Sequence, residues 1–202
     1  MVEDLAGHTG PATPDGLYAS PPPWDIGRPQ PAFLTLAEAG RLRGRVLDVG
    51  CGTGEHALLA AQLGLQATGV DLAGNALRTA EHKAGDRGLH ARFLQFDALK
   101  LAELGESFDT ILDCGLFHIL AGEQRAAYVT SLHSALSPGG QYYLLGFSDQ
   151  HHGPFGRHRL TRQDITAAFA DRWRLDTIEP ASIDITAAPY AVAAWFAAAT
   201  RI

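Results

Sequence analysis

Residues 45–57 read RVLDVGCGTGEHA, an apolar run that breaks into glycines and then continues with the spacing of a helix. Gly50, Gly52 and Gly54 carry no Cβ, so the backbone can turn sharply there and come close to a bound molecule. A turn of this kind after the first strand of an α/β sheet is a place where nucleotides bind. Glycine-rich turns also occur for purely geometric reasons, so the residues around the turn must decide between a binding role and a structural role.

The pattern on both sides of this turn alternates between short apolar runs and helical periods. The apolar runs predict strands at residues 45–50, 66–72, 91–97, 108–115 and 141–147. Helical periods are found at residues 31–42, 56–64, 75–85 and 123–140. This alternation is typical of an α/β protein with a doubly wound, mostly parallel sheet that is covered by helices on both faces.

The C-terminal part of the chain departs from this alternation. A helical pattern at residues 161–172 is followed by two strand-like stretches, 173–185 and 190–202, with a short polar link that contains proline. Strands that are so close in sequence pair antiparallel, so we expect a C-terminal hairpin at the sheet edge and seven strands in total. The alanine content of the second stretch is also compatible with a helix.

Charge and composition limit the classes of partner. The chain of 202 residues is 46% apolar and has a formal net charge of −6, which disfavours nucleic acid and anionic membrane surfaces. No apolar stretch approaches the roughly 20 residues of a membrane span, and the first thirty residues lack a signal-peptide pattern. We therefore expect a cytoplasmic protein that is a monomer or a homodimer and has no membrane or nucleic-acid partner.

The same features suggest the domain organisation. Residues 1–17 are rich in Gly, Pro, Thr and acidic residues without a period, and are expected to form a mobile tail. Residues 18–202 are expected to form one domain, which begins with a proline-rich arm at residues 18–44. Cys51 and Cys114 both follow apolar runs, where a free thiol usually serves as a small apolar side chain.

Acidic residues near the glycine turn indicate the kind of ligand. Asp71 ends the next predicted strand, twenty-three positions after Asp48, where a carboxylate can accept both hydroxyls of a ribose. Asp48 and Glu55 add two further carboxylates around the loop. Such a site suits a ligand that carries both an ammonium and a sulfonium, as S-adenosylmethionine does.

NAD is a weaker alternative. In a dinucleotide fingerprint that begins at Gly50, the third glycine would fall where this chain has Glu55, and its charge would repel a pyrophosphate. A fingerprint that begins at Gly52 does fit the looser ending in alanine at Ala57, so the sequence excludes NAD only in part.

The ordered motifs LDVGCGTG (47–54), GVDL (69–72), FDA (96–98) and LDCG (112–115) resemble those of class I S-adenosylmethionine-dependent methyltransferases. The resemblance implies that Asp71 binds the ribose, Asp97 and Ala98 meet the adenine, and Asp113 and Cys114 line the floor below the methionine end. A helix cap is the structural alternative for Asp97. The cofactor-binding residues implied in this way are Trp24, Asp48, Gly50, Cys51, Gly52, Gly54, Glu55, Asp71, Leu72, Asp97, Ala98, Asp113 and Cys114.

The arm segment PPWDIGRPQPAF (22–33) is similar to the N-terminal segment of the thiopurine, thiol and halide methyltransferases, and more so to mycobacterial heterocyclic toxin methyltransferases. That resemblance implies a lid in which Trp24 covers the methionine or the substrate, where an indole attracts a sulfonium and excludes water. Alternatively, Trp24 plugs the edge of the core and Asp25 caps the next turn. Arg28 is expected to pair with Asp25 or to meet a substrate anion.

Histidines that follow the fourth and fifth predicted strands are candidate catalytic bases. His118, His151 and His152 lie at the edge of the sheet where doubly wound proteins hold their chemistry, and Asp149 could orient one of them. Zinc binding by the two adjacent histidines with His158 is a less favoured alternative, and no metal is expected. The candidate substrate-binding residues are Tyr18, Trp24, Arg28, Phe117, His118, Phe147 and Phe155.

Together these features predict an enzyme that transfers a methyl group from S-adenosylmethionine to O, N or S of a small aromatic heterocycle. A hydroxyquinolone or a phenol-like toxin would be such an acceptor, in detoxification or secondary metabolism. Two alternatives remain open at this stage. One is a biosynthetic methyltransferase that acts on a quinone or another carbon acceptor, and the other is a cofactor-binding protein without catalysis.

Overall fold

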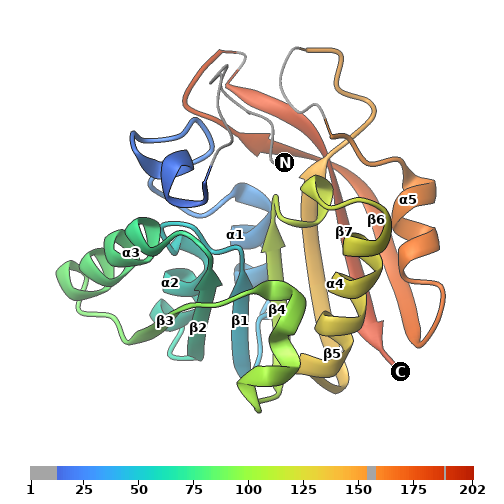
Figure 1. Cartoon of the computed structure of the whole chain (residues 1–202), viewed down its shortest axis with the longest axis horizontal. Coiled ribbons are helices and arrows are strands. Elements are labelled where there is room, and N and C mark those ends of the chain that lie inside the picture. Colours follow the sequence, from blue (N-terminus) through green and yellow to red (C-terminus); the bar gives the residue numbers. More distant parts are fainter. Residues whose placement is uncertain (1–12, 154–157, 189) are drawn as a thin grey trace.

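The computed structural model describes residues 13–153, 158–188 and 190–202. These residues form one seven-stranded sheet with helices on both faces (Figure 1), which confirms the predicted fold class. The strands are β1 (Arg45–Val49), β2 (Gln66–Asp71), β3 (Ala91–Gln95), β4 (Phe108–Cys114), β5 (Leu136–Phe147), β6 (Trp173–Asp184) and β7 (Ala191–Arg201). The helices are α1 (Pro31–Glu38), α2 (Glu55–Gln62), α3 (Gly74–Asp86), α4 (Gly122–Ala135) and α5 (Arg162–Ala168), with 3-10 turns η1 (Asp15–Tyr18), η2 (Ala98–Leu104) and η3 (Phe117–Ile119). None of the helices in these ranges is long and apolar enough to cross a membrane.

The strand order β3-β2-β1-β4-β5-β7-β6 places the glycine turn at the centre of the sheet. Strands β1 to β5 pair in parallel, and the chain moves from β1 toward one edge through β2 and β3 before it returns through β4 and β5. The carboxyl ends of β1 and β4 are therefore the point at which the direction of winding changes. Ligands of doubly wound sheets bind in the crevice at such a point.

Strand β7 runs antiparallel between β5 and β6, so the predicted C-terminal hairpin is confirmed and the helical alternative for this stretch is wrong. Its alternate side chains enter opposite cores. Trp195, Ala197 and Ala199 pack on the side of α4 and α5, whereas Val192 and Ala194 pack on the side of α1 and α2. Burial with a period of two on both faces is a property of an interior strand, and it outweighs the helical preference of alanine.

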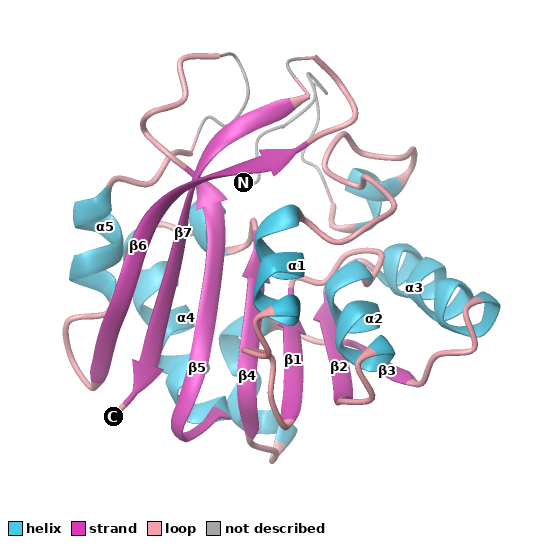
Figure 2. Cartoon of the chain, turned by 180° about the vertical axis from the view of Figure 1, so that it is seen from behind, coloured by secondary structure: helices cyan, strands magenta, loops and turns pink. Residues whose placement is uncertain are grey.

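The two faces of the sheet carry separate apolar cores. Tyr142 and Leu144 of β5 face the core that includes residues of α4 and α5, and Tyr143 and Leu145 face the core under α1 and α2. Figure 2 shows α1 and α2 in front of the sheet and α4 behind it. Each core fixes one side of the central strands, so the carboxyl ends of those strands have little freedom to move.

The proline-rich arm crosses the carboxyl edge of the sheet, and hydrogen bonds hold both the residues before it and the arm itself. Before the arm, the backbone N–H of Asn75 on α3 donates to Asp15 Oδ1 at 2.9 Å, and the Asn75 amide donates to the Asp15 carbonyl at 2.8 Å. Within the arm, the carbonyl of Pro23 accepts from the N–H of Thr186, after β6, at 2.8 Å. Residues 13–17 of the segment predicted as a mobile tail thus carry the start of η1 and a contact to α3, and residues 1–12 lie outside the described part.

Gln30 anchors the arm where it enters α1. Its side-chain amide donates to the carbonyl of Asp184 at 3.0 Å and accepts from the N–H of the same residue at 2.8 Å. Its own backbone N–H donates to His56 Nε2 on α2 at 3.2 Å, and the residue is 3% exposed. One buried side chain therefore joins the arm to the end of β6 and to α2.

We predict that Gln30→Ala lowers the free energy of unfolding by about 2 kcal/mol, because it leaves two backbone groups of Asp184 without their partner. Urea denaturation followed by circular dichroism measures this change. The matched control is Gln62→Ala on the exposed surface of α2, for which a change below about 0.5 kcal/mol is expected. Equal midpoints for the two variants would show that Gln30 does not anchor the arm.

Candidate active site

All three glycines of the turn have left-handed backbone conformations, with φ of 65° at Gly50, 50° at Gly52 and 84° at Gly54. Their surroundings differ. A Cβ at Gly54 would lie 2.7 Å from the ring of Phe93, so this glycine is needed for packing below the turn. A Cβ at Gly52 would collide with the hydroxyl of Tyr18, which lies directly over the turn. The turn is therefore a cradle that only glycine permits, covered by a side chain from the start of the arm.

Asp71 joins the end of β2 to this cradle. Its Oδ2 accepts from the N–H of Gly52 and its Oδ1 accepts from the N–H of Ala73, each at 2.8 Å. Burial raises the pKa of Asp71, and the hydrogen bonds from backbone N–H groups oppose that shift. Each carboxylate oxygen can accept a second hydrogen bond, so Asp71 has the capacity to bind ribose hydroxyls, and its contact with a ribose stays a prediction.

Asp48 supplies a second carboxylate below the turn. It is 1% exposed, its Oδ2 accepts from the N–H of Ala57 at 3.1 Å, and its Oδ1 has no hydrogen-bond partner within the described residues. His56 Nδ1 lies 4.0 Å from that Oδ1. Burial raises the pKa of Asp48 well above its ordinary value. A buried carboxylate oxygen without a partner is suited to a ligand with a cationic group, so the residues present fit S-adenosylmethionine.

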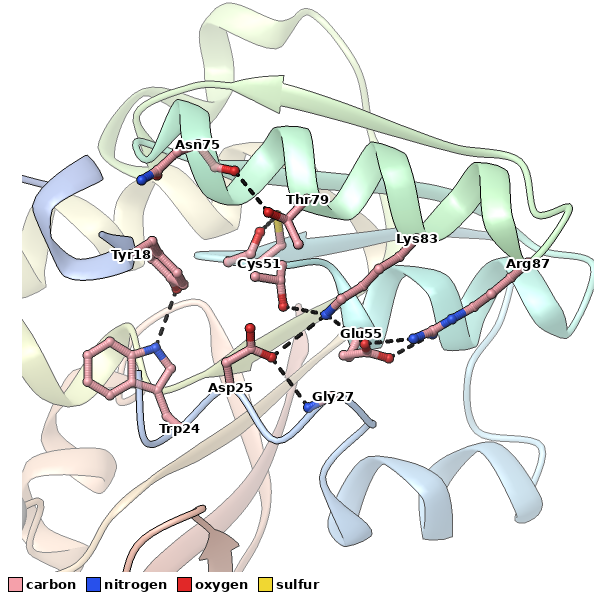
Figure 3. Close-up of polar contacts among 12 residues, drawn as sticks. Tyr18, Trp24, Asp25, Gly27, Cys51, Glu55, Asn75, Thr79, Lys83 and Arg87 are labelled. Atoms are coloured by element: carbon pink, nitrogen blue, oxygen red, sulfur yellow. Dashed lines mark hydrogen bonds and ion pairs between the residues drawn. The ribbon is translucent and has the colours of Figure 1, made fainter. Parts of the chain in front are cut away.

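Glu55 does not have the role that the sequence predicted for it. Its carboxylate accepts from Lys83 Nζ at 2.8 Å and from both terminal nitrogens of Arg87 at 2.8 and 2.9 Å, so it faces α3 (Figure 3). Burial alone would raise the pKa of Glu55, but the hydrogen bonds and charges of Arg87 and Lys83 lower it overall. Its charge is compensated within the protein, and the argument that it repels a pyrophosphate therefore fails.

Asp113 is also a structural residue and not part of a floor below the methionine end. It is fully buried, and its oxygens accept four hydrogen bonds. The donors are Tyr128 Oη and Tyr142 Oη, both at 2.8 Å, and the N–H groups of Leu116 at 2.9 Å and Phe117 at 3.3 Å. Burial raises the pKa of Asp113 to about 6 against the effect of these donors. The carboxylate fixes the turn from β4 into η3 from below.

The side chains of the two predicted cofactor-binding cysteines pack into apolar clusters. Cys51 Sγ points into the apolar cluster that α2 and α3 share with Phe93, where it prevents a side chain at Gly69. Cys114 packs against the core under α1 and α2. Burial raises the pKa of both thiols well above the ordinary value, so neither is an ionised nucleophile.

The residues predicted to meet the adenine lie beyond the end of β3. Asp97 Oδ1 accepts from the N–H of Leu99 at 2.9 Å, so one of its oxygens caps η2, as the structural alternative proposed. Ala98 is the first residue of η2, next to the cap. Leu72, which follows Asp71, is 49% exposed, and Gln95 Nε2 donates to its carbonyl at 2.9 Å. Contact of Asp97, Ala98 and Leu72 with the adenine stays a prediction.

The candidate histidines differ strongly in environment. His118 is 4% exposed, with Nδ1 accepting from the N–H of Phe147 at 3.5 Å and no partner for Nε2 in the described part of the chain. Burial, together with the neighbouring His158 and Arg125 side chains, lowers the pKa of His118 to about 3. His151 is also buried, and its Nε2 likewise lacks a partner among the described residues, whereas His152 is exposed.

Several other expectations for the acceptor side are corrected. Phe117 is fully buried in the core, stacked on Phe169 with ring centroids 5.6 Å apart, so it does not line a pocket. Arg28 pairs with Asp184 at 2.7 Å and not with Asp25. Asp149 Oδ1 accepts from Trp195 Nε1 at 3.1 Å.

The remaining candidates for contact with the acceptor are aromatic residues. Phe147 contacts the ring of His118, with centroids 4.5 Å apart, and Trp24 Nε1 donates to Tyr18 Oη at 3.4 Å. Phe155 falls outside the described residues. No cluster of three or more metal-binding side chains occurs within the described ranges.

Two basic residues of this region were not identified from the sequence. Lys83 and Arg87 are four positions apart, at the end of α3, and both bind Glu55. A pair of basic residues at this spacing lies on one helix face and indicates a common anionic partner. That signal was present, but it does not identify the partner.

Comparison with known proteins agrees with this geometry. A family model described as a methyltransferase domain matches residues 46–140. The 2-heptyl-1-hydroxyquinolin-4(1H)-one methyltransferase of Mycobacteroides abscessus is 36% identical over 168 residues, which cover 82% of this chain and 74% of the relative. The chain therefore belongs to the class I S-adenosylmethionine-dependent methyltransferases, as the motifs predicted.

Solved structures agree with this assignment. One described as "Conversion of a Disulfide Bond into a Thioacetal Group during Echinomycin Biosynthesis" is 38% identical, with a TM-score of 0.83 over 93% of this chain and 91% of that chain. Magnesium protoporphyrin IX methyltransferase from Synechocystis PCC 6803 with bound S-adenosylmethionine shares the fold at 22% identity, with a TM-score of 0.66 over 85% of this chain and 76% of that chain.

We predict that Gly52→Ala weakens binding of S-adenosylhomocysteine at least tenfold, because the added methyl group strains a left-handed residue and displaces Tyr18. Isothermal titration calorimetry measures the affinity. Gly64→Ala is the matched control, since Gly64 also has a positive φ of 77° but no atoms near the place of its Cβ. Equal affinities for the two variants would contradict the assignment of the cradle to the cofactor.

Proposed function

We propose that the protein transfers the methyl group of S-adenosylmethionine to an O, N or S atom of a small aromatic heterocycle, such as a hydroxyquinolone or a phenol-like compound. The observation that carries this proposal is the unpartnered, buried Nε2 of His118 beside the ring of Phe147. One polar atom in an aromatic environment, at the edge of the sheet where the donor binds, suits a flat ring that carries a heteroatom.

The relatives support an acceptor heteroatom on a small molecule. The Mycobacteroides relative is named for a hydroxyquinolone, and the echinomycin structure is named for the conversion of a disulfide into a thioacetal. Both are at least 36% identical over most of this chain. The first name contains a hydroxylated ring and the second contains sulfur groups, so oxygen and sulfur acceptors are both included in the test.

We propose that His118 donates a hydrogen bond to the acceptor and does not act as a general base. Because its Nδ1 accepts from the N–H of Phe147, the proton of the neutral imidazole lies on Nε2. A histidine with a pKa of about 3 holds an added proton poorly at neutral pH. A hydrogen bond to an oxygen of the acceptor would orient the ring and stabilise its anionic form, and proximity to the methyl group would supply most of the acceleration.

The arm is proposed to act as a lid of a single domain over residues 18–202. Tyr18 and Trp24 lie at the glycine turn, and the arm is held by the ion pair of Asp25 with Lys83 on α3 and by the hydrogen bonds of Gln30 to Asp184 at the end of β6. His151 is a second candidate for contact with the acceptor, because its Nε2 is buried and has no partner in the described residues.

The proposed acceptor class is tested by incubating the protein with labelled S-adenosylmethionine and a panel of hydroxyquinolones, phenols, thiols and quinones. We expect products heavier by one methyl group on O, N or S for several aromatic heterocycles, detected by mass spectrometry. Methylation of a quinone carbon alone would support the biosynthetic alternative. Binding of the cofactor without any product would support the non-catalytic alternative.

For the accepted ring we predict that His118→Phe lowers kcat/KM about 100-fold, because it keeps the ring packing but removes the donor. Binding of S-adenosylhomocysteine should be unchanged. The control is His90→Phe on the exposed loop before β3, which is expected to leave kcat/KM within about twofold.

The pH profile separates a donor from a base. The free-enzyme pKa of His118 is about 3, so its charge does not change between pH 5 and 8, and kcat/KM should show no acidic limb from this residue. Rates measured from pH 5 to 9 for the wild type and His118→Phe test this. An acidic limb near pH 6.5 that disappears in the variant would identify His118 as a base.

A further inference from the structure

Lys83 on α3 contacts three segments that meet at the glycine turn (Figure 3). Its Nζ donates to Thr53 Oγ1 at 2.8 Å and to Glu55 Oε1 at 2.8 Å, and it lies 3.7 Å from Asp25 Oδ1. Thr53 belongs to the turn itself, Glu55 begins α2, and Asp25 belongs to the proline arm. A single ammonium therefore links the cradle, the helix behind it and the arm in front of it.

The charges around Lys83 allow its ammonium to pair with Asp25 of the arm. Arg87 binds both oxygens of Glu55, so the charge of Glu55 already has a bidentate partner. The positive charge of Lys83 then compensates Asp25. The exposed fractions of the two side chains are 20% for Lys83 and 18% for Asp25, so water and salt screen this pair less than an ordinary surface pair.

The part of the arm held in this way is joined to the side chain that covers the glycine turn. Asp25 directly follows Trp24, whose indole N–H donates to Tyr18 Oη over Gly52. Asp25 Oδ1 also accepts from the N–H of Gly27 at 3.4 Å, which shapes the turn of the arm after Trp24. A shift of Asp25 would therefore move the indole and, through it, the side chain that covers the cradle.

We infer that Lys83 is a positioning residue for the methyl donor: through Asp25 it holds arm residues 22–27 against the glycine turn, and donor affinity depends on that contact. In this role Lys83 acts through Asp25 and does not itself contact the donor. The inference rests on the donor site of the family and not on the acceptor proposed above.

Calorimetric titration with S-adenosylhomocysteine tests this role without an acceptor. We expect Lys83→Met and Asp25→Asn each to weaken binding roughly tenfold, and the double variant to bind no worse than the weaker single variant, because both changes break one contact. Arg87→Met is the matched control. This change also removes a cation from Glu55, four residues further on at the C-cap of α3, but Arg87 does not contact the arm, so the affinity should stay within about twofold of the wild type.

Hydrogen exchange gives a second readout that a purely structural role of Lys83 in α3 would not produce. Amide protection at residues 24–27, which follow the prolines at 22 and 23, should fall in Lys83→Met and Asp25→Asn but not in Arg87→Met. Wild-type affinity in Lys83→Met, or equal losses in Lys83→Met and Arg87→Met, would overturn the inference. If Lys83→Met does not fold, Asp25→Asn decides, since wild-type affinity in that variant would overturn it as well.

The same experiment separates this inference from the proposed function. A wild type that binds S-adenosylhomocysteine but methylates no aromatic heterocycle would contradict the acceptor proposal only. A wild type that does not bind it would overturn the donor site, and with it the role of Lys83.

Discussion

The carboxylate of Asp71 is the constraint on which the site depends. It accepts from the N–H of Gly52, in the turn after β1, and from the N–H of Ala73, ahead of α3. One side chain thereby fixes the spacing between the turn after β1 and the turn after β2, next to the switch point of the sheet. The left-handed glycines make this approach possible, since a side chain in the turn would separate the two segments.

The arm completes the site because it is bonded to elements on both sides of the sheet centre. Gln30 and Arg28 attach it to Asp184 at the end of β6, and Asp25 lies beside Lys83 of α3. Proline stiffness lowers the entropy lost when such a segment is ordered. Among the described residues, few buried side-chain polar atoms lack a hydrogen-bond partner, and His118 Nε2 is one of them.

Contiguous patterns made the sheet, the hairpin, the turn and the position of Asp71 predictable, because each is encoded within a few neighbouring residues. The directions of Glu55 and Asp113 were not predictable. Both carboxylates follow the expected motifs, but their partners lie far away in sequence: Lys83 is 28 residues from Glu55, and Tyr142 is 29 residues from Asp113. The direction in which a side chain points beside a turn depends on such distant partners. The burial that lowers the pKa of His118 likewise depends on residues that are distant in sequence.

A crystal structure of the protein with S-adenosylhomocysteine tests the central claim most directly. The account predicts ribose hydroxyls within hydrogen-bond distance of the Asp71 carboxylate, and the amino-acid end of the ligand along residues 50–54 beneath the arm. A ligand bound elsewhere, with the Tyr18 hydroxyl still resting on Gly52, would contradict the account.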